Sequence, residues 1–575
     1  MIAPRRTLAT SAPDPRWRTI ILAGYLAAFA SLIAFLWYFR HNQVLLYGDA
    51  VAHINIARRV FDSRTPGLRQ LGTVWLPLPH LLILPFVVPD WSWQTGFGAS
   101  WPFMIAFVAG VVGIFRLVRD GLTPPSSAST PAWPSRLAPW FAALVYGANP
   151  SLLYMQSTAM TESLYLALFI WAVVFLADFV RHWLSPDPAQ RAKSGRALIR
   201  CGACLALGML TRYDAWFAAA AIAAVVVILL LRPAKSAEVV WRQETRSLRR
   251  PLIVFAVLLL AVPAFWFTYN AVIYGDPLDF VRGPYSARGI EQRTSRPGER
   301  HPGDHSLGTA AIYFVKSAEL NQTEGPLERA WIALAAAGVI LLLVYFRRLS
   351  AWLLLLVPLP FYTLSIAYGG VPIFMPMWPP FSFYNARYGL QLLPAFAVFG
   401  ALALYWVWLR PPRPRWRAVA AVLSFAFVGA SYGFAWRDQP ICLREAVANS
   451  RTRVAFERSL SAYLTLLPPD STLLMYIGAH VGALQDAGIH LSRVIHEGNH
   501  GDPNIWGKDG MWRRALADPA KYADYAVGFD DDEVSKSAEA HHFPALLVIH
   551  TVGQPAATIY GTHPPYPGMP PLPSR

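Results

Sequence analysis

Residues 49–62, DAVAHINIARRVFD, follow shortly after an apolar run of bilayer length, Thr19 to Phe39. This polar stretch predicts a helix that lies along the membrane surface instead of crossing it, because its apolar residues recur at helical spacing. A shorter, proline-bearing apolar stretch, Trp75 to Val88, predicts a second surface helix. The apolar residues of the first stretch are Ala50, Ile54, Ala57 and Phe61.

The whole chain has the composition of a membrane protein. Of its 575 residues, 55% are hydrophobic and 15% are charged, and the mean hydropathy is +0.34. Soluble domains carry about 25% charged residues. The net charge of +16 comes mostly from Lys and Arg in short loops between apolar runs, where basic residues orient helices in a membrane. We therefore predict no nucleic-acid partner.

The apolar runs predict about eleven spanning helices. Basic residues gather at alternate ends of these runs, which places the N-terminus, 1–18, inside the cell and residues 19–436 in the membrane. Two long segments, 40–100 and 271–328, then lie outside, as does the tail, 437–575. The predicted spans are 19–39, 101–118, 137–155, 162–180, 199–210, 216–231, 252–270, 330–346, 352–368, 388–409 and 418–436.

The tail predicts a small extracytoplasmic α/β domain. Short β-like runs, LLMYI at Leu473, YAVGF at Tyr525 and ALLVI at Ala545, alternate with helical stretches. Its run HEGNH lacks the spacing that puts two histidines one turn apart around zinc, so we predict no metal site. The fold class is thus an all-α polytopic membrane domain with two surface helices and a small C-terminal α/β domain.

Burying an ionisable residue in a membrane is energetically costly, and such residues are often functional. We therefore take the ionisable residues at the ends of the predicted helices as candidate site residues. Carboxylates ringed by arginines suit chemistry on a phosphate-bearing lipid. The predicted topology collects such residues at the outer face: Asp49, His53, Arg58, Arg59, His80, Glu162, Arg212, Asp214, Arg282, Arg288 and Arg387.

Position alone leaves two interpretations for each of these groups. Asp49 is either a helix N-cap or an ionised carboxylate that takes or orients a proton of an acceptor hydroxyl. Glu162 either starts a helix or belongs to the site. Each arginine either holds phosphate or extends to the lipid headgroups. The basic stretch 286–305 either orders over substrate as a lid or is an insertion.

Four local patterns, in this order, resemble the GT-C superfamily of integral-membrane glycosyltransferases, in the branch of the aminoarabinose transferase and the protein O-mannosyltransferases. The resemblance covers residues 15–436 and leaves the tail outside the shared core. Ala50 follows Asp49 where many relatives have a second acid, so a divalent metal, although possible, is not supported. The patterns are YGDAVAHINIARR (47–59), WLPLPHLL (75–82), MTESLYLALFIW with LTRYDAWF (160–171, 210–217) and FYNARYGLQLLPAFAV (383–398).

The resemblance implies inverting transfer of a sugar from a polyprenyl-phosphate donor to a hydroxyl of a glycan, lipid or protein, at the outer side of the cytoplasmic membrane. Asp49 would be the catalytic residue, and no cofactor is implied. One alternative is a multi-span lipid or glycan transporter or flippase, which would place charges near helix midpoints. Another is a receptor or assembly protein that acts through its tail. The expected substrate and phosphate contacts are His53, Arg58, His80, Glu162, Arg212, Arg387 and Tyr388.

Overall fold

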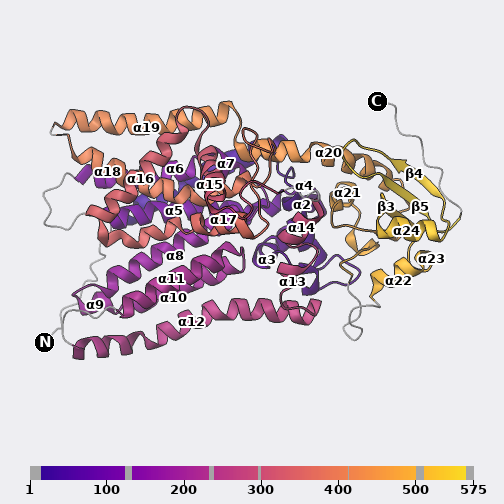
Figure 1. Ribbon diagram of the computed structural model, residues 1–575, viewed down its shortest axis with the longest axis horizontal. Helices are drawn as coiled ribbons and strands as arrows, with labels where there is room; N and C mark the ends of the chain where they lie inside the picture. Colours follow the sequence, from indigo (N-terminus) through magenta and orange to yellow (C-terminus); the bar gives the residue numbers. More distant parts are fainter. Residues whose placement is uncertain are drawn as a thin grey trace, which may run out of the picture.

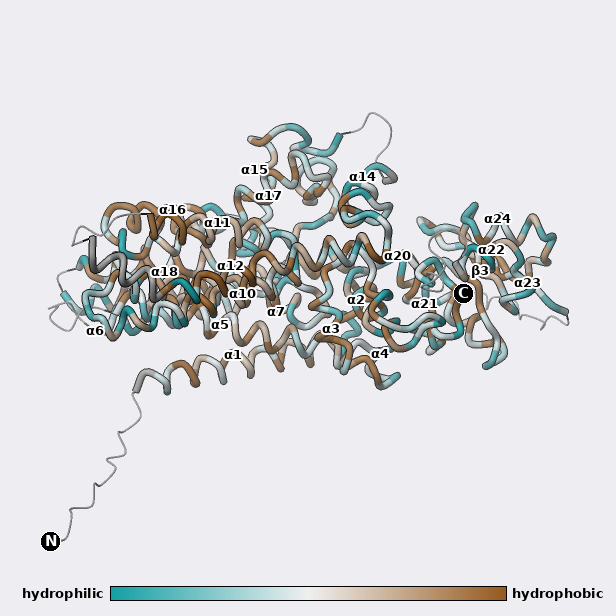
Figure 2. Tube along the Cα trace, turned by 90° about the horizontal axis from the view of Figure 1, so that it is seen from below, coloured by the Kyte–Doolittle hydropathy of each residue, from teal (hydrophilic) through white to brown (hydrophobic). Residues whose placement is uncertain are grey.

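The computed structural model describes residues 15–123, 132–231, 238–294, 300–411, 413–499 and 510–564. A bundle of long helices forms one end of the elongated molecule and a small α/β domain forms the other (Figure 1). Apolar residues are concentrated in the bundle, whereas the α/β end is more polar (Figure 2). The predicted fold class, a polytopic membrane domain with a small C-terminal domain, is confirmed.

The bundle helices lie at the predicted spans, but some spans are divided. The predicted span 137–155 is divided between α6 and the short helix α7 (Pro150–Met155), and 352–368 begins in the 3₁₀ helix η4 (Arg347–Leu356). In the part of the chain that the structure describes, nine helical stretches are long and apolar enough to cross a bilayer. Two shorter helices, α6 and α10, have 16 residues each and rise about 24 Å. The bundle comprises α1 (Pro15–Arg40), α5 (Trp101–Leu122), α6 (Ala132–Gly147), α8 (Glu162–Trp183), α10 (Ser194–Met209), α11 (Asp214–Leu231), α12 (Glu238–Tyr274), α16 (Glu328–Tyr345), α17 (Pro358–Tyr368), α18 (Leu393–Leu409) and α19 (Pro414–Arg437).

Small residues let the central helices approach closely. Helix α8 packs between α5 and α10, and α18 packs between α6 and α16. On α5, Gly113 faces Ile170 of α8, and a methyl group at this glycine would come within 2.7 Å of the isoleucine side chain. On α16, Gly338 lies against the backbone of Phe399 in α18. Glycine at such contacts is typical of helix packing in membranes. There, the hydrophobic effect does not drive helices together, so close van der Waals contact between backbones holds them.

Short helices lie between the bundle and the α/β domain (Figure 1). The predicted surface helices are present as α2 (Gly48–Arg59) and α3 (Leu78–Ile83), followed by α4 (Asp90–Thr95). The second long segment, 271–328, is more helical than a loop: it contains α13 (Asp279–Arg282), α14 (Ala287–Thr294) and α15 (Leu307–Gln322). Part of the basic stretch, 295–299, lies outside the described residues.

Helix α20 (Ile441–Leu464) leads from the bundle into a five-stranded sheet of order β2-β1-β3-β5-β4. The first three strands in this order are parallel, and β5 is antiparallel to both of its neighbours. The three predicted β-like runs are strands, whereas β2 and β5 were not predicted. The elements are β1 (Leu473–Met475), α21 (Val481–Ala487), β2 (Val494–Ile495), α22 (Met511–Ala517), α23 (Pro519–Tyr522), β3 (Tyr525–Phe529), α24 (Glu533–Ala540), β4 (Ala545–Ile549) and β5 (Ala557–Gly561).

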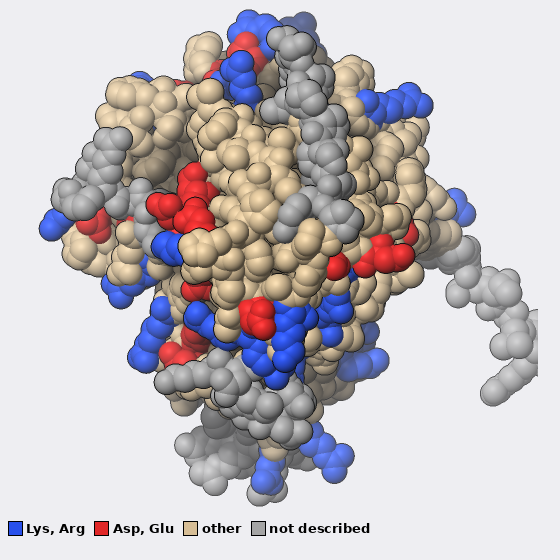
Figure 3. Space-filling view, turned by 90° about the vertical axis from the view of Figure 1, so that its right-hand side faces the viewer, with Lys and Arg blue, Asp and Glu red and all other residues tan. Residues whose placement is uncertain are grey.

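The face of the α/β end carries both signs of charge. Viewed from that end, Lys and Arg side chains lie interspersed with Asp and Glu side chains (Figure 3). Polar contacts join the domain to the first long segment: Asn55 donates to Gln485 over 2.6 Å, and the carboxylate of Asp62 accepts the backbone N–H of Ser492 over 2.9 Å. The α/β domain is therefore docked on α2 as well as linked to α19.

Arg58 is the central group of this docking surface. Its guanidinium forms ion pairs with Asp62 at 2.8 Å and with Asp90 at 2.6 Å. It also donates to the carbonyl oxygens of Val87 and Val88 and lies 4.7 Å from the ring centre of Trp93. Because Arg58 and Asp62 are both buried, each depends on the other for compensation of its charge.

We predict that Arg58→Ala destabilises the protein by about 3 kcal/mol, because it leaves the buried carboxylate of Asp62 without its cation. Thermal unfolding of the purified full chain in detergent measures the effect as a lowered melting temperature. Arg64→Ala is the control, since Arg64 is exposed and its side chain donates to Thr472 at the same interface. Equal melting temperatures for the two variants would contradict this role of Arg58.

Candidate active site

Ionisable side chains from distant parts of the chain meet where the bundle adjoins α2. Asp49 comes from the first turn of α2, Glu162 is the first residue of α8, and Asp214 is the first residue of α11. The short 3₁₀ helix η5 (Ala386–Leu392) supplies Arg387. We define the ion cluster as Asp49, Glu162, Arg212, Asp214, Arg387 and Glu445.

Arg387 faces three carboxylates at once. Its Nη2 donates to Asp49 Oδ2 over 2.6 Å and its Nη1 donates to Glu445 Oε1 over 3.3 Å. Its Nε lies 3.3 Å from Glu162 Oε1. The backbone N–H of Arg387 also donates to the second oxygen of Glu445, over 3.2 Å. Such a guanidinium is held in one orientation, because each of its three nitrogen atoms lies within 3.3 Å of a carboxylate oxygen.

Arg212 forms the second half of the cluster. It lies 3.3 Å from Glu162 Oε1, the oxygen that also faces Arg387, and 3.2 Å from Asp214 Oδ2. Its Nη2 donates to the hydroxyl of Tyr362, which in turn donates to Asp214, each over 2.9 Å. The ring of Tyr388 lies beside both guanidinium groups, with its centre 5.3 Å from that of Arg212 and 5.1 Å from that of Arg387.

Accessibility separates Asp49 from the other carboxylates of the cluster. Its side chain is 39% exposed, whereas those of Glu162 and Glu445 are 1% exposed and that of Asp214 is 3% exposed. Asp49 does not cap α2: the helix begins at Gly48 and has no side-chain cap bond. The three buried carboxylates hold the arginines, while Asp49 is the member that an incoming molecule can reach.

Two predicted contacts, His53 and His80, form a buried pair beside Asp49. His53 lies one turn beyond Asp49 on α2, and its Nδ1 is 2.8 Å from Nε2 of His80 on α3. Burial lowers the pKa of His53 to about 4 and holds the pKa of His80 well below its ordinary value. Both rings are thus neutral at pH 7, where they join the two surface helices and supply no positive charge for a phosphate.

The predicted site residues therefore divide into two groups. The structure brings Asp49, Glu162, Arg212, Arg387 and Tyr388 together, with the histidine pair adjacent. Arg58 is not among them, because its donors are used on the docking surface described above. Sequence reasoning missed Tyr362, which lies within an apolar run, and Glu445, which lies in the tail. Among the residues that the structure describes, no three His, Cys, Asp or Glu side chains are arranged to hold a metal ion.

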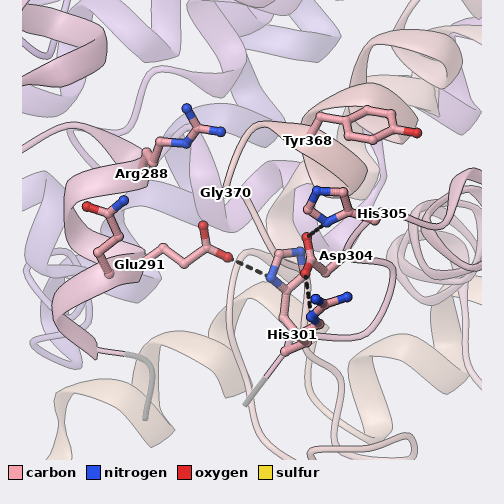
Figure 4. Close-up of a pocket in the computed structure, with 9 residues that line it drawn as sticks. Arg288, Glu291, His301, Asp304, His305, Tyr368 and Gly370 are labelled. Carbon is pink, nitrogen blue, oxygen red and sulfur yellow. Dashed lines mark hydrogen bonds and ion pairs between the residues drawn. The ribbon is translucent and has the colours of Figure 1, made fainter. Parts of the chain in front are cut away.

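A separate pocket of about 320 Å³ lies at the end of α17 (Figure 4). The His301 side chain joins two of its walls. One ring nitrogen is 2.7 Å from Glu291 of α14, and the other is 2.8 Å from the carbonyl oxygen of Ile366. Tyr368 in this pocket is six residues beyond Tyr362, about 9 Å along the helix, so the pocket lies beyond the ion cluster. Its lining residues are Arg288, Glu291, Gln292, Arg300, His301, Asp304, His305, Tyr368 and Gly370.

Comparison with known proteins identifies the fold. No protein-family model matches the sequence, and no curated protein matches it significantly. ArnT from Cupriavidus metallidurans bound to undecaprenyl phosphate matches with a TM-score of 0.55 at 13% identity, over 96% of this chain and 99% of that chain. The same protein in the apo state matches with a TM-score of 0.55 at 12% identity, over 95% and 98%. The fold is that of ArnT.

The ArnT fold extends over almost the whole chain. The match therefore includes most of the α/β domain, which the four sequence patterns do not reach. An oligosaccharyltransferase from Archaeoglobus fulgidus, tethered to an acceptor peptide with the NVT sequon, matches with a TM-score of 0.42 at 13% identity, over 96% of this chain and 74% of that chain.

We predict that the neutral histidine pair makes stability fall in acid. The folded-state pKa of His53, about 4, is below its ordinary value, so its contribution is present above about pH 6.5 and is lost as pH falls towards 4. Its loss amounts to about 3 kcal/mol. Denaturant unfolding of the full chain between pH 7 and 4 should show a shallower decline for His53→Gln than for wild type.

The control for this measurement is His541→Gln, which alters an exposed histidine of the α/β domain. This variant should keep the wild-type decline of stability with acid. An unchanged decline in His53→Gln would show that the buried pair does not set the acid limit.

Proposed function

We propose that the chain is a glycosyltransferase that moves a sugar from a polyprenyl-phosphate donor to an acceptor hydroxyl. The observation that carries this proposal is the position of Asp49, an accessible carboxylate held by a buried ion network at the bundle end of an ArnT fold. The ArnT structure was obtained with undecaprenyl phosphate bound, and we extend that class of carrier to the donor of this chain.

The reaction we propose is a single displacement with inversion. Asp49 accepts or orients the proton of an acceptor hydroxyl, whose oxygen forms a bond to the anomeric carbon. The bond from that carbon to the phosphate oxygen breaks, and its electron pair leaves with the carrier phosphate. Arg387 stabilises the negative charge that develops on the phosphate, because a guanidinium beside the reacting atoms acts strongly in a site shielded from water.

This chemistry requires a place for the phosphate on Arg387, but the donors of Arg387 already face carboxylates. Glu162 and Glu445 are buried, whereas Asp49 is the exposed partner, so an arriving phosphate can displace only Asp49 without opening the core. Phosphate is a strong bidentate acceptor for arginine. We therefore propose that the donor phosphate replaces Asp49 on Arg387 and that the freed carboxylate turns to the acceptor hydroxyl.

The same geometry disfavours a transporter. Glu162 and Asp214 are the first residues of their helices, and Arg387 is the second residue of η5. The charges therefore lie at helix ends, whereas substrate sites of many transporters lie near the bilayer midplane. We place the protein in the cytoplasmic membrane with the ion cluster and the α/β domain outside, as the basic inner loops predict. The sugar is a hexose or a pentose, and the acceptor is a glycan, a lipid or a protein.

We predict that Asp49→Asn lowers transfer by about 10²-fold or more, because the amide cannot accept the proton. The measurement is transfer of radiolabelled sugar in membranes that contain polyprenyl-phosphate sugars and acceptor extracts. Asp438→Asn is the matched control: Asp438 is 37% exposed and also pairs with an arginine, but it lies outside the cluster. Wild-type transfer by Asp49→Asn would end the proposal.

If the phosphate replaces Asp49 on Arg387, the substitution that lowers transfer should strengthen phosphate binding. Asp49→Asn should bind undecaprenyl phosphate several-fold more tightly than wild type, because the phosphate no longer competes with a carboxylate for the guanidinium. Arg387→Gln should bind it more weakly than wild type. Lipid titration followed by native mass spectrometry compares the three proteins, and weaker binding by Asp49→Asn would contradict the exchange.

A further inference from the structure

Helix α20, from the region after the membrane helices, contributes a buried carboxylate to the ion cluster. Both oxygens of Glu445 are used on Arg387: Oε1 accepts from Nη1 over 3.3 Å, and Oε2 accepts from the backbone N–H over 3.2 Å. The Glu445 side chain is almost completely buried. It therefore fixes the guanidinium and also the start of η5, which carries that guanidinium.

The same helix holds the chain that leads into α2. Arg453 of α20 donates to the carbonyl oxygens of Leu45 and Leu46, over 3.1 and 3.0 Å. The hydroxyl of Tyr47 donates to the carbonyl oxygen of Cys442, over 2.9 Å. Because these residues directly precede the helix that carries Asp49, α20 constrains both sides of the pair between Asp49 and Arg387.

We propose that Glu445 is a positioning residue, which holds Arg387 in place while the donor phosphate replaces Asp49. This inference rests on the proposed function. When Asp49 turns away, Arg387 loses its shortest contact in the cluster, and a long arginine side chain without fixed partners adopts many rotamers. Glu445 and Glu162 then remain as its anchors, and only Glu445 also fixes the backbone. The phosphate site is thus complete only when α20 is docked.

A second carboxylate on α20 offers a matched comparison. Glu457 lies on the same helix, is also buried, and pairs with Arg453 at 2.5 Å. It is not part of the ion cluster. Loss of either carboxylate should therefore cost stability, but only loss of Glu445 removes an anchor of the Arg387 guanidinium. Loss of Glu457 acts through Arg453 on the chain that precedes α2.

The test compares wild type with Glu445→Ala, Glu445→Gln and Glu457→Ala, each as the full chain in detergent. The affinity for undecaprenyl phosphate is measured by native mass spectrometry. Glu445→Ala should bind about tenfold more weakly, since one charge-assisted hydrogen bond that positions the guanidinium is lost. Glu445→Gln should recover part of this affinity, because its amide oxygen still accepts from Nη1. Glu457→Ala, which keeps both oxygens of Glu445 on Arg387, should bind undecaprenyl phosphate more tightly than Glu445→Ala does, although its melting temperature is also lower.

A second measurement needs no lipid. The backbone N–H of Arg387 should exchange with deuterium faster in Glu445→Ala than in wild type, and at the wild-type rate in Glu457→Ala. Wild-type affinity together with wild-type exchange in Glu445→Ala would overturn the inference while leaving the proposed function intact. Failure of wild type itself to bind undecaprenyl phosphate would instead overturn the proposed function.

Discussion

The structure depends on keeping two arginines charged at the end of a membrane bundle. A guanidinium removed from water is stable only with carboxylates around it, and here Glu162 lies within 3.3 Å of both Arg212 and Arg387. The carboxylates come from α2, α8, α11 and α20, so these helices must meet at one point. This requirement joins the membrane bundle, the first surface helix and the region after residue 437 into one unit.

Two histidines and Arg58 extend that unit away from the cluster. The pair of His53 and His80 joins α2 to α3, and Arg58 joins α2 to α4 through Asp90. The α/β domain also contacts this helix, through the hydrogen bond from Asn55 to Gln485. Helix α2 is thus held by three separate contacts, while Asp49 in its first turn keeps an exposed carboxylate. An anchored helix with one accessible acid is the arrangement that positions a catalytic group precisely.

Most of the fold was predictable because bilayer length and loop charge act locally in the sequence. The cluster was partly predictable, since an acid or arginine at the end of an apolar run, such as Glu162 or Arg387, is costly without a role. The role of Glu445 was not predictable, because this residue lies in an ordinary polar helix and only the folded structure shows its contact with Arg387. Arg58 was assigned to phosphate although Asp62 lies only four residues away, because its other partners, Val87, Val88 and Asp90, lie 29 to 32 residues away. Pairing between distant residues is the information that one sequence lacks.

We propose that a carboxylate and a phosphate occupy Arg387 in turn. Cryo-electron microscopy of the full chain with undecaprenyl phosphate tests this most directly. We expect the phosphate within hydrogen-bonding distance of Arg387, with Asp49 rotated towards the solvent and Glu445 still in contact with the guanidinium. A phosphate bound elsewhere, with Asp49 still paired to Arg387, would show that the two groups do not exchange on this arginine.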